Sequence, residues 1–171
     1  LLAERPMHGY EINATLEERN IREWAPVSRP QIYYSLEKLS GLGLLRAAKD
    51  KGPAAGPERR VVGTTKEGRE CLADALEAEH WVYDRVYQPF LIWLALSWQA
   101  RGRTFNDQLS RRKKFLLARL ADEQVTLDEV LKEVGHRHHE AVWMLELVIE
   151  QTEIELRWID KVIANSPKRA P

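Results

Sequence analysis

The side chains best suited to bind a partner through hydrogen bonds gather on one short segment, SRPQIYYSLEKLS, at residues 28–40. On a helical wheel, Ile32, Tyr33, Leu36 and Leu39 fall within one arc, so we expect them to face the protein. The opposite side presents glutamine, tyrosine, serine and lysine, rather than the mixture of Glu and Lys typical of a solvated face. This composition favours a binding surface, although a solvated helix face is the alternative interpretation.

These outward side chains have the chemistry that contacts DNA. An amide pairs with adenine and a guanidinium with guanine in the major groove, whereas hydroxyl and ammonium groups also reach phosphate oxygens. The amino end of a helix attracts phosphate as well, because its backbone N–H groups are unpaired. We expect base contacts from Arg29, Gln31, Tyr34 and Ser35 and a phosphate contact from Lys38. The predicted DNA-binding residues of this helix are Ser28, Arg29, Gln31, Tyr34, Ser35 and Lys38.

The flanking segments predict how this helix is held. Ser28 can cap its amino end, Pro30 suits its first turn, and Gly41 and Gly43 are stop signals near its end. A shorter helix over residues 10–19 precedes it, which makes a helix-turn-helix. Strand-like segments at 44–49 and 59–64 flank a Gly- and Pro-rich tip at 51–57, and Thr65 can cap a following helix that runs into the 70s.

Positive charge is concentrated around this hairpin. The chain has 26 Lys and Arg against 26 Asp and Glu and no net charge, so any nucleic-acid footprint must be local. Residues 22–66 contain nine Lys and Arg against four Asp and Glu. The hairpin is therefore predicted to be a wing whose cations contact phosphates, with affinity that falls steeply with salt. The predicted wing contacts are Lys49, Lys51, Arg59 and Arg60.

From about residue 80 onward the pattern is almost entirely helical. We expect a helix over 107–133 with a weak point at Val125 and Thr126, a break at Gly135, and a last helix over 136–165. Apolar residues of that last helix recur at spacings of three and four, like a coiled-coil seam. The seam is explained either by packing within one chain or by a homodimer contact, which the length of the helix favours. The predicted dimerisation residues are Val142, Leu145, Ile149, Leu156, Ile159 and Ile163.

Other candidate sites give weaker predictions. Trp93 and Trp98 are explained by core packing or by a pocket for a small apolar or aromatic effector. The histidines of the HRHH run at 136–139 lack the partners of a zinc site, and the RRKK run at 111–114 fits an ordinary wet helix face, with a secondary DNA contact as the alternative.

No motif for catalysis is found, so we expect neither an enzyme nor a cofactor nor a metal. Cys71 is the single cysteine, which favours a reducing compartment. The most apolar run, at 90–98, is too short to span a bilayer, so a cytoplasmic protein without a membrane partner is expected. The sequence begins with Leu1 rather than Met, so we expect its true start to be missing.

Four segments together resemble the PadR family of winged-helix transcriptional regulators. Residues 6–12 (PMHGYEI) resemble its "hGYEI" opening, and 32–39 (IYYSLEKL) resemble its "iYpaLkrLe" helix. Residues 43–45 (GLL) are similar to its "Gli", and 65–69 (TKEGR) to its "T..Gr". The four appear in the family's order.

The resemblance implies a homodimer that reads DNA with the 29–42 helix and usually represses until an effector binds. By motif position, Tyr33 is the helix tyrosine, and Gly9 and Tyr10 begin the preceding helix. Two departures concern the wing and the start: Val62 stands where the return strand usually has tyrosine, and the family's first helix is nearly absent.

The sequence therefore predicts a mainly α fold, with a winged helix-turn-helix domain at 1–79 and an all-helical dimerisation domain at 80–171. The expected function is a sequence-specific regulator, most simply a repressor, that binds double-stranded DNA as a homodimer on a near-palindromic operator. The alternative is a helical protein-interaction module whose winged domain does not bind DNA, which the zero net charge would suit.

Overall fold

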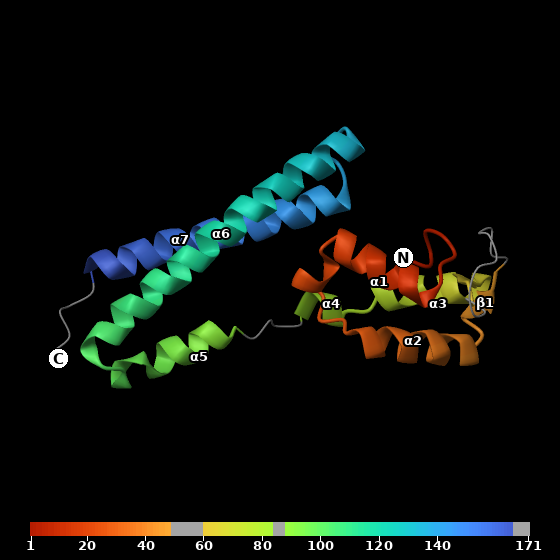
Figure 1. Cartoon of the computed structure of the whole chain (residues 1–171), viewed down its shortest axis with the longest axis horizontal. Helices are drawn as coiled ribbons and strands as arrows, with labels where there is room; N and C mark the ends of the chain where they lie inside the picture. Colours follow the sequence, from red (N-terminus) through yellow and green to blue (C-terminus); the bar gives the residue numbers. More distant parts are fainter. Residues whose placement is uncertain (49–59, 84–87, 166–171) are drawn as a thin grey trace. The chain divides into compact units, whose positions relative to one another are not determined.

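The computed structural model describes residues 1–48, 60–83 and 88–165. Contacts divide the chain into two compact units, Leu1–Val86 and Tyr87–Pro171. The first unit is helical with one small hairpin, and the second is entirely helical in its described part (Figure 1). The predicted mainly α fold with a winged amino-terminal part is confirmed.

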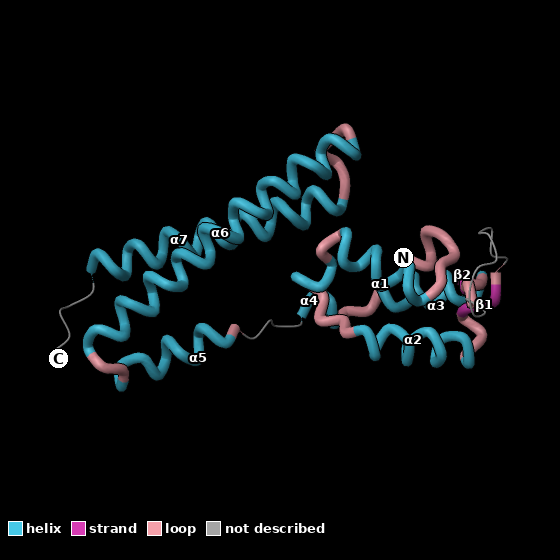
Figure 2. The backbone as a smooth tube through the Cα atoms, viewed as in Figure 1, coloured by secondary structure: helices cyan, strands magenta, loops and turns pink. Residues whose placement is uncertain are grey.

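The first unit is built from α1 (Gly9–Glu18), the short 3-10 helix η1 (Ile21–Glu23), α2 (Arg29–Gly41), the strands β1 (Leu45–Ala47) and β2 (Val62–Thr64), α3 (Lys66–Leu76) and α4 (His80–Tyr83) (Figure 2). A buried cluster of Met7, Ile12, Leu16 and Ile32 joins α1 to α2. The helix spacing of these apolar side chains produces this contact, because residues three or four apart share one face.

Both helices of the pair begin with reciprocal caps. In α2, Ser28 Oγ accepts from the Gln31 N–H at 3.4 Å, and Gln31 Oε1 accepts from the Ser28 N–H at 2.7 Å. In α1, His8 Nδ1 and the Glu11 carboxylate exchange the same two bonds with each other's backbone N–H groups. Each cap satisfies two N–H groups that a helix start leaves unpaired. The prediction of Ser28 as N-cap is confirmed.

The hairpin and α3 are locked together at Thr65. The strands β1 and β2 pair antiparallel, with Arg46 opposite Gly63. The Thr65 hydroxyl oxygen accepts from the Gly68 N–H at 3.0 Å, and its backbone N–H donates to the Leu44 carbonyl at 3.0 Å. A Cβ placed on Gly68 would collide with that same carbonyl oxygen. The spacing of Thr65 and Gly68 thus combines a helix cap with a close approach that only glycine permits.

The second unit contains α5 (Pro89–Leu96), η2 (Ser97–Gln99), α6 (Gly102–Val134) and α7 (Glu140–Asn165). The two long helices pack against each other as an antiparallel hairpin (Figure 1). Their buried cluster comprises Phe105, Leu109 and Leu116 from α6 with Leu156 and Ile159 from α7. Two Arg112–Glu155 hydrogen bonds, at 2.8 and 3.0 Å, cross the same interface.

One expectation for this unit is met and one is corrected. The helix α6 is continuous through the weak point expected at Val125 and Thr126, where the Thr126 hydroxyl donates to the Asp122 carbonyl one turn earlier. The last helix does not begin at residue 136. Gly135, with φ 78°, ends α6 in the left-handed conformation, and residues 136–139 form the turn before α7, where the Ala141 N–H donates to His139 Nδ1.

Among the described helices, none combines the length and apolar character needed to cross a membrane.

Candidate nucleic-acid interface

The outer face of α2 presents its polar side chains to solvent. Tyr34 is 66% exposed, and Ser35 and Lys38 are exposed as well. Ser28 and Gln31 are also exposed, but they are joined in the helix cap. Because the cap uses the side-chain oxygen of Gln31, a bidentate contact of this residue with adenine would require the cap to open.

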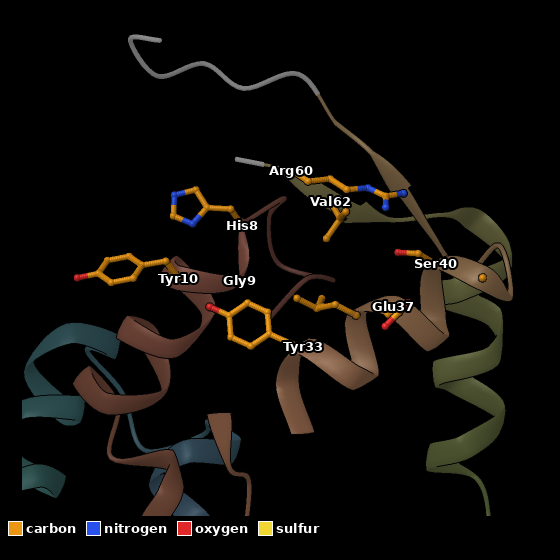
Figure 3. Close-up of a pocket in the computed structure, with 10 residues that line it drawn as sticks. His8, Gly9, Tyr10, Tyr33, Glu37, Ser40, Arg60 and Val62 are labelled. Carbon is orange, nitrogen blue, oxygen red and sulfur yellow. The ribbon is translucent and has the colours of Figure 1, made fainter. Parts of the chain in front are cut away.

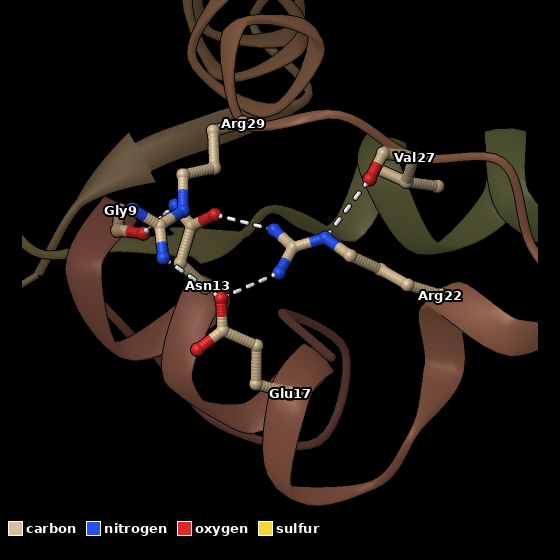
Figure 4. A network of polar contacts seen from close by, with 6 residues as sticks. All are labelled: Gly9, Asn13, Glu17, Arg22, Val27 and Arg29. Atoms are coloured by element: carbon tan, nitrogen blue, oxygen red, sulfur yellow. Dashed lines mark hydrogen bonds and ion pairs between the residues drawn. The ribbon is translucent and has the colours of Figure 1, made fainter.

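Arg29 lies on the first turn of α2 and is held by an ion pair with α1. Its Nη2 lies 2.8 Å from Oε1 of Glu17 (Figure 4). The Arg22 Nη1 donates to the same oxygen at 2.8 Å, while its Nη2 donates to Asn13 Oδ1 at 2.7 Å and its Nε to the Val27 carbonyl at 3.0 Å. The hydrogen bond from Arg29 holds the pKa of the Glu17 carboxyl below its usual range and raises the pKa of Arg29. Arg22 therefore ties the turn before α2 to α1, whereas Arg29 stays 68% exposed.

An open hollow of about 810 Å³ lies between the start of α1, α2 and β2. Tyr10 and Tyr33 stand beside it with His8, and Arg60 lies across from them (Figure 3). Their phenol, imidazole and guanidinium groups are hydrogen-bond donors. The rest of its lining is largely apolar and includes the Glu37 carboxylate, so the hollow is a mixed surface beside α2.

Tyr33 corrects one prediction from the helical wheel. It was expected to face the protein, but it is 54% exposed. Its ring crosses over Gly9, where an added Cβ would stand 2.6 Å from Tyr33 Cε1. The wheel ranks positions by angle alone, whereas the phenol hydroxyl favours an edge position with one side wet. Tyr10, at 74% exposed, was named only through the family motif.

Of the predicted wing contacts, only Arg60 lies among the described residues, where it is exposed. Lys49, Lys51 and Arg59 lie outside the described residues. The structure adds one exposed cation of the hairpin that is not among the predicted contacts, Arg46 on β1. Arg46 follows the buried Leu45 directly on the strand, and successive side chains of a strand point to opposite faces.

The seam predicted on α7 is largely covered by the chain itself. Val142, Leu145, Leu156 and Ile159 are buried, and Ile149 and Ile163 are half-buried. Packing within one chain therefore accounts for these positions. A second apolar row on the same helix remains exposed, within an arc of about 60° on the opposite side at 100° per residue. Its members are Trp143, Leu147, Ile154 and Trp158.

Of the two tryptophans considered for an effector pocket, only Trp93 lines a hollow in the structure. Trp93 stacks on Phe90 and Phe105, with ring centroids 5.4 and 5.8 Å apart, and it lines a hollow of about 340 Å³. Trp98 is 72% exposed and does not line this hollow. The other lining residues are Phe90, Gln108, Arg111, Arg112 and Phe115.

The described part of the chain contains no group of three or more His, Cys, Asp and Glu side chains placed to hold a metal ion. His136 and His139 lie with ring centroids 6.4 Å apart in the turn between α6 and α7.

The family model described as the transcriptional regulator PadR-like family matches residues 1–74. These residues belong to the PadR-like family. The resemblance expected from the four sequence motifs is thereby confirmed. The family is one of transcriptional regulators and not a class of enzymes.

Solved structures of PadR proteins share the fold over nearly the whole chain. Bacillus subtilis PadR in complex with operator DNA matches with a TM-score of 0.81, 18% identity, and coverage of 95% of this chain and 91% of that chain. The same protein in complex with p-coumaric acid matches with a TM-score of 0.76, 18% identity, and coverage of 95% of this chain and 92% of that chain. The PadR-like regulator BC1756 from Bacillus cereus matches with a TM-score of 0.73, 18% identity, and coverage of 95% of this chain and 91% of that chain. No curated protein sequence matches the chain.

Proposed function

We propose that this protein is a sequence-specific DNA-binding regulator that represses transcription as a homodimer. The observation that carries the proposal is the exposed polar face of α2 in a PadR-like winged domain. Arg29, Tyr34 and Ser35 are proposed to contact bases, with Gln31 taking part through its amide. Lys38 and Arg60 are proposed to bind phosphates, as are the hairpin cations Lys49, Lys51 and Arg59. The direction of regulation, repression, comes from the family resemblance, and the role requires a cytoplasmic protein.

A salt series tests the DNA contact. Each neutralised phosphate contributes about one unit of salt slope, so Lys38→Ala should reduce the slope for duplex DNA by about one and leave base preference unchanged. Lys132→Ala removes the same charge from α6 and serves as the control. Equal slopes for wild type and Lys38→Ala would count against a phosphate contact at α2.

A homodimer is supported by the two apolar faces of α7. One face is covered by α6. On the other face Trp158 contacts the Phe90 ring edge-on, whereas Trp143, Leu147 and Ile154 are more than half exposed and need another partner. The helix α5, sequence PFLIWLAL, is apolar on all sides, yet Leu91, Ile92 and Leu96 are exposed. A helix that is apolar all round is normally buried. We propose that a second copy of the chain covers these residues, and that the resulting dimer reads two half-sites about one DNA turn apart.

An aromatic effector is proposed for the hollow beside Trp93. Its volume, about 340 Å³, is at the small end of ligand pockets. The rings of Phe90 and Phe115 line it on either side of Arg112, whose guanidinium lies 5.1 and 5.7 Å from their centroids. Arg111 offers a second cation for a carboxylate. The relative from Bacillus subtilis has been solved with p-coumaric acid, a ligand of this chemistry. Titration with p-coumarate should quench tryptophan fluorescence of the wild type, and Arg111→Ala should weaken the binding.

A protein-interaction module that does not bind DNA is the second candidate. It is favoured by the absence of net charge and by the ion pair that occupies Arg29. A gel shift with genomic DNA fragments separates the two, because an interaction module retards no fragment at physiological salt.

A further inference from the structure

Near the amino end of α2, Glu17 forms ion pairs with two arginines that differ in burial. Arg22 is largely covered and directs its three donor nitrogens to Glu17, Asn13 and the Val27 carbonyl. Arg29 is exposed and contacts Glu17 through Nη2 alone. The carboxylate therefore links a fixed guanidinium to one that faces solvent (Figure 4).

We propose that Glu17 is a positioning residue that sets the sequence discrimination of DNA binding by orienting Arg29. This inference rests on the proposed DNA-binding function. One Nη2–H of Arg29 stays on the carboxylate, and the other Nη2–H and the Nη1–H groups remain for a base edge. A guanine O6 and N7 pair accepts two such donors at once.

The same contact restrains Arg29 from binding phosphates of any sequence. To reach a phosphate elsewhere on the duplex, the guanidinium must leave Glu17 and sacrifice a charge-assisted hydrogen bond. Holding the side chain also removes part of the rotamer entropy that base recognition would otherwise cost. Arg22 contributes as well, because its positive charge offsets the repulsion between the Glu17 carboxylate and an approaching phosphate.

Glu17→Gln and Glu18→Gln, each in the full chain, form a matched pair of tests. Both positions lie on the last turn of α1, both are exposed, and both substitutions remove one negative charge. Among the described contacts, Glu18 has no arginine partner. Binding is measured to a mixed-sequence duplex and to the duplex selected from a random pool, over a salt series, with thermal unfolding as a check on folding.

Glu17→Gln should tighten mixed-sequence binding by about threefold, the scale of an exposed ion pair, and steepen its salt slope by about one. The ratio of selected to mixed-sequence affinity should fall by about threefold or more. Glu18→Gln should leave this ratio unchanged. In an Arg29→Ala background, Glu17→Gln should no longer change the ratio, because Glu17 acts through Arg29.

Identical behaviour of the two glutamine variants would overturn the inference while leaving the proposed function intact. So would an effect of Glu17→Gln that persists without Arg29. If the wild type binds neither duplex, the proposed function itself fails, and this inference fails with it.

Discussion

The roles of the two faces of α7 can be distinguished by making the same substitution, Leu→Ala, at one leucine on each face. Leu156 is 8% exposed and packs against α6, whereas Leu147 lies in the uncovered row and is 56% exposed. We predict that Leu156→Ala damages the fold of each chain and that Leu147→Ala damages association between chains. Leu156, predicted as a dimerisation residue, is thus part of the core of its own chain.

The magnitudes follow from burial. Leu→Ala removes three carbon atoms, about 2.4 kcal/mol for complete burial at about 0.8 kcal/mol each. For Leu156, nearly all of this is lost and a cavity is added, so unfolding should become easier by about 2–5 kcal/mol. For Leu147, the buried part contributes only about 1 kcal/mol within the chain. Covering its exposed part in both subunits of a two-fold dimer contributes about 2.7 kcal/mol, which is about a hundredfold in the dissociation constant.

Two assays read these quantities. Sedimentation equilibrium measures the dimer dissociation constant, and urea unfolding at several protein concentrations measures stability, because association stabilises the folded chain by mass action. The reasoning is refuted if Leu147→Ala leaves the dissociation constant unchanged while Leu156→Ala yields folded monomers. That result would return the dimer contact to the buried seam.

Two further substitutions test the first unit. Gly68→Ala should lower stability by about 1–3 kcal/mol, since its Cβ would press on the Leu44 carbonyl, whereas Gly41→Ala meets nothing within 4 Å and should be tolerated; thermal unfolding compares them. The hydrogen bond from the His8 N–H lowers the pKa of the Glu11 carboxyl, so its contribution is present above the usual glutamate pKa, about 4.3, and is lost as pH falls through the lower folded value. Between pH 6 and 3, urea midpoints of Glu11→Gln should therefore fall less than those of wild type, although modestly for so exposed a group.

Local chemistry made the first unit predictable from sequence. The capping residues Ser28 and Thr65 marked helix starts within a residue of their observed places. Gly135 marked the end of α6, because it adopts the positive φ that other residues avoid. These signals depend on a few neighbouring residues, and nothing distant overrides them.

Features that depend on how the helices pack against each other were harder to predict from the sequence. The seam of α7 could not reveal whether α6 or a second chain covers it, because both give the same spacing. The wheel of one helix contains neither the exposure of Tyr33 nor the contact of its ring with Gly9 of α1, because both depend on how the two helices pack. The ion pair of Glu17 with Arg29 spans a turn that includes the left-handed Asn20, so the periodicity of neither helix predicts it.

Selection of duplexes from a random pool by the wild-type chain tests most directly whether the outer face of α2 reads DNA. We predict enrichment of a two-fold symmetric sequence whose half-sites lie about one helical turn, or about 10 base pairs, apart. The preference should weaken when Tyr34 or Arg29 is replaced by alanine. A pool that remains random after repeated rounds at physiological salt would contradict the claim.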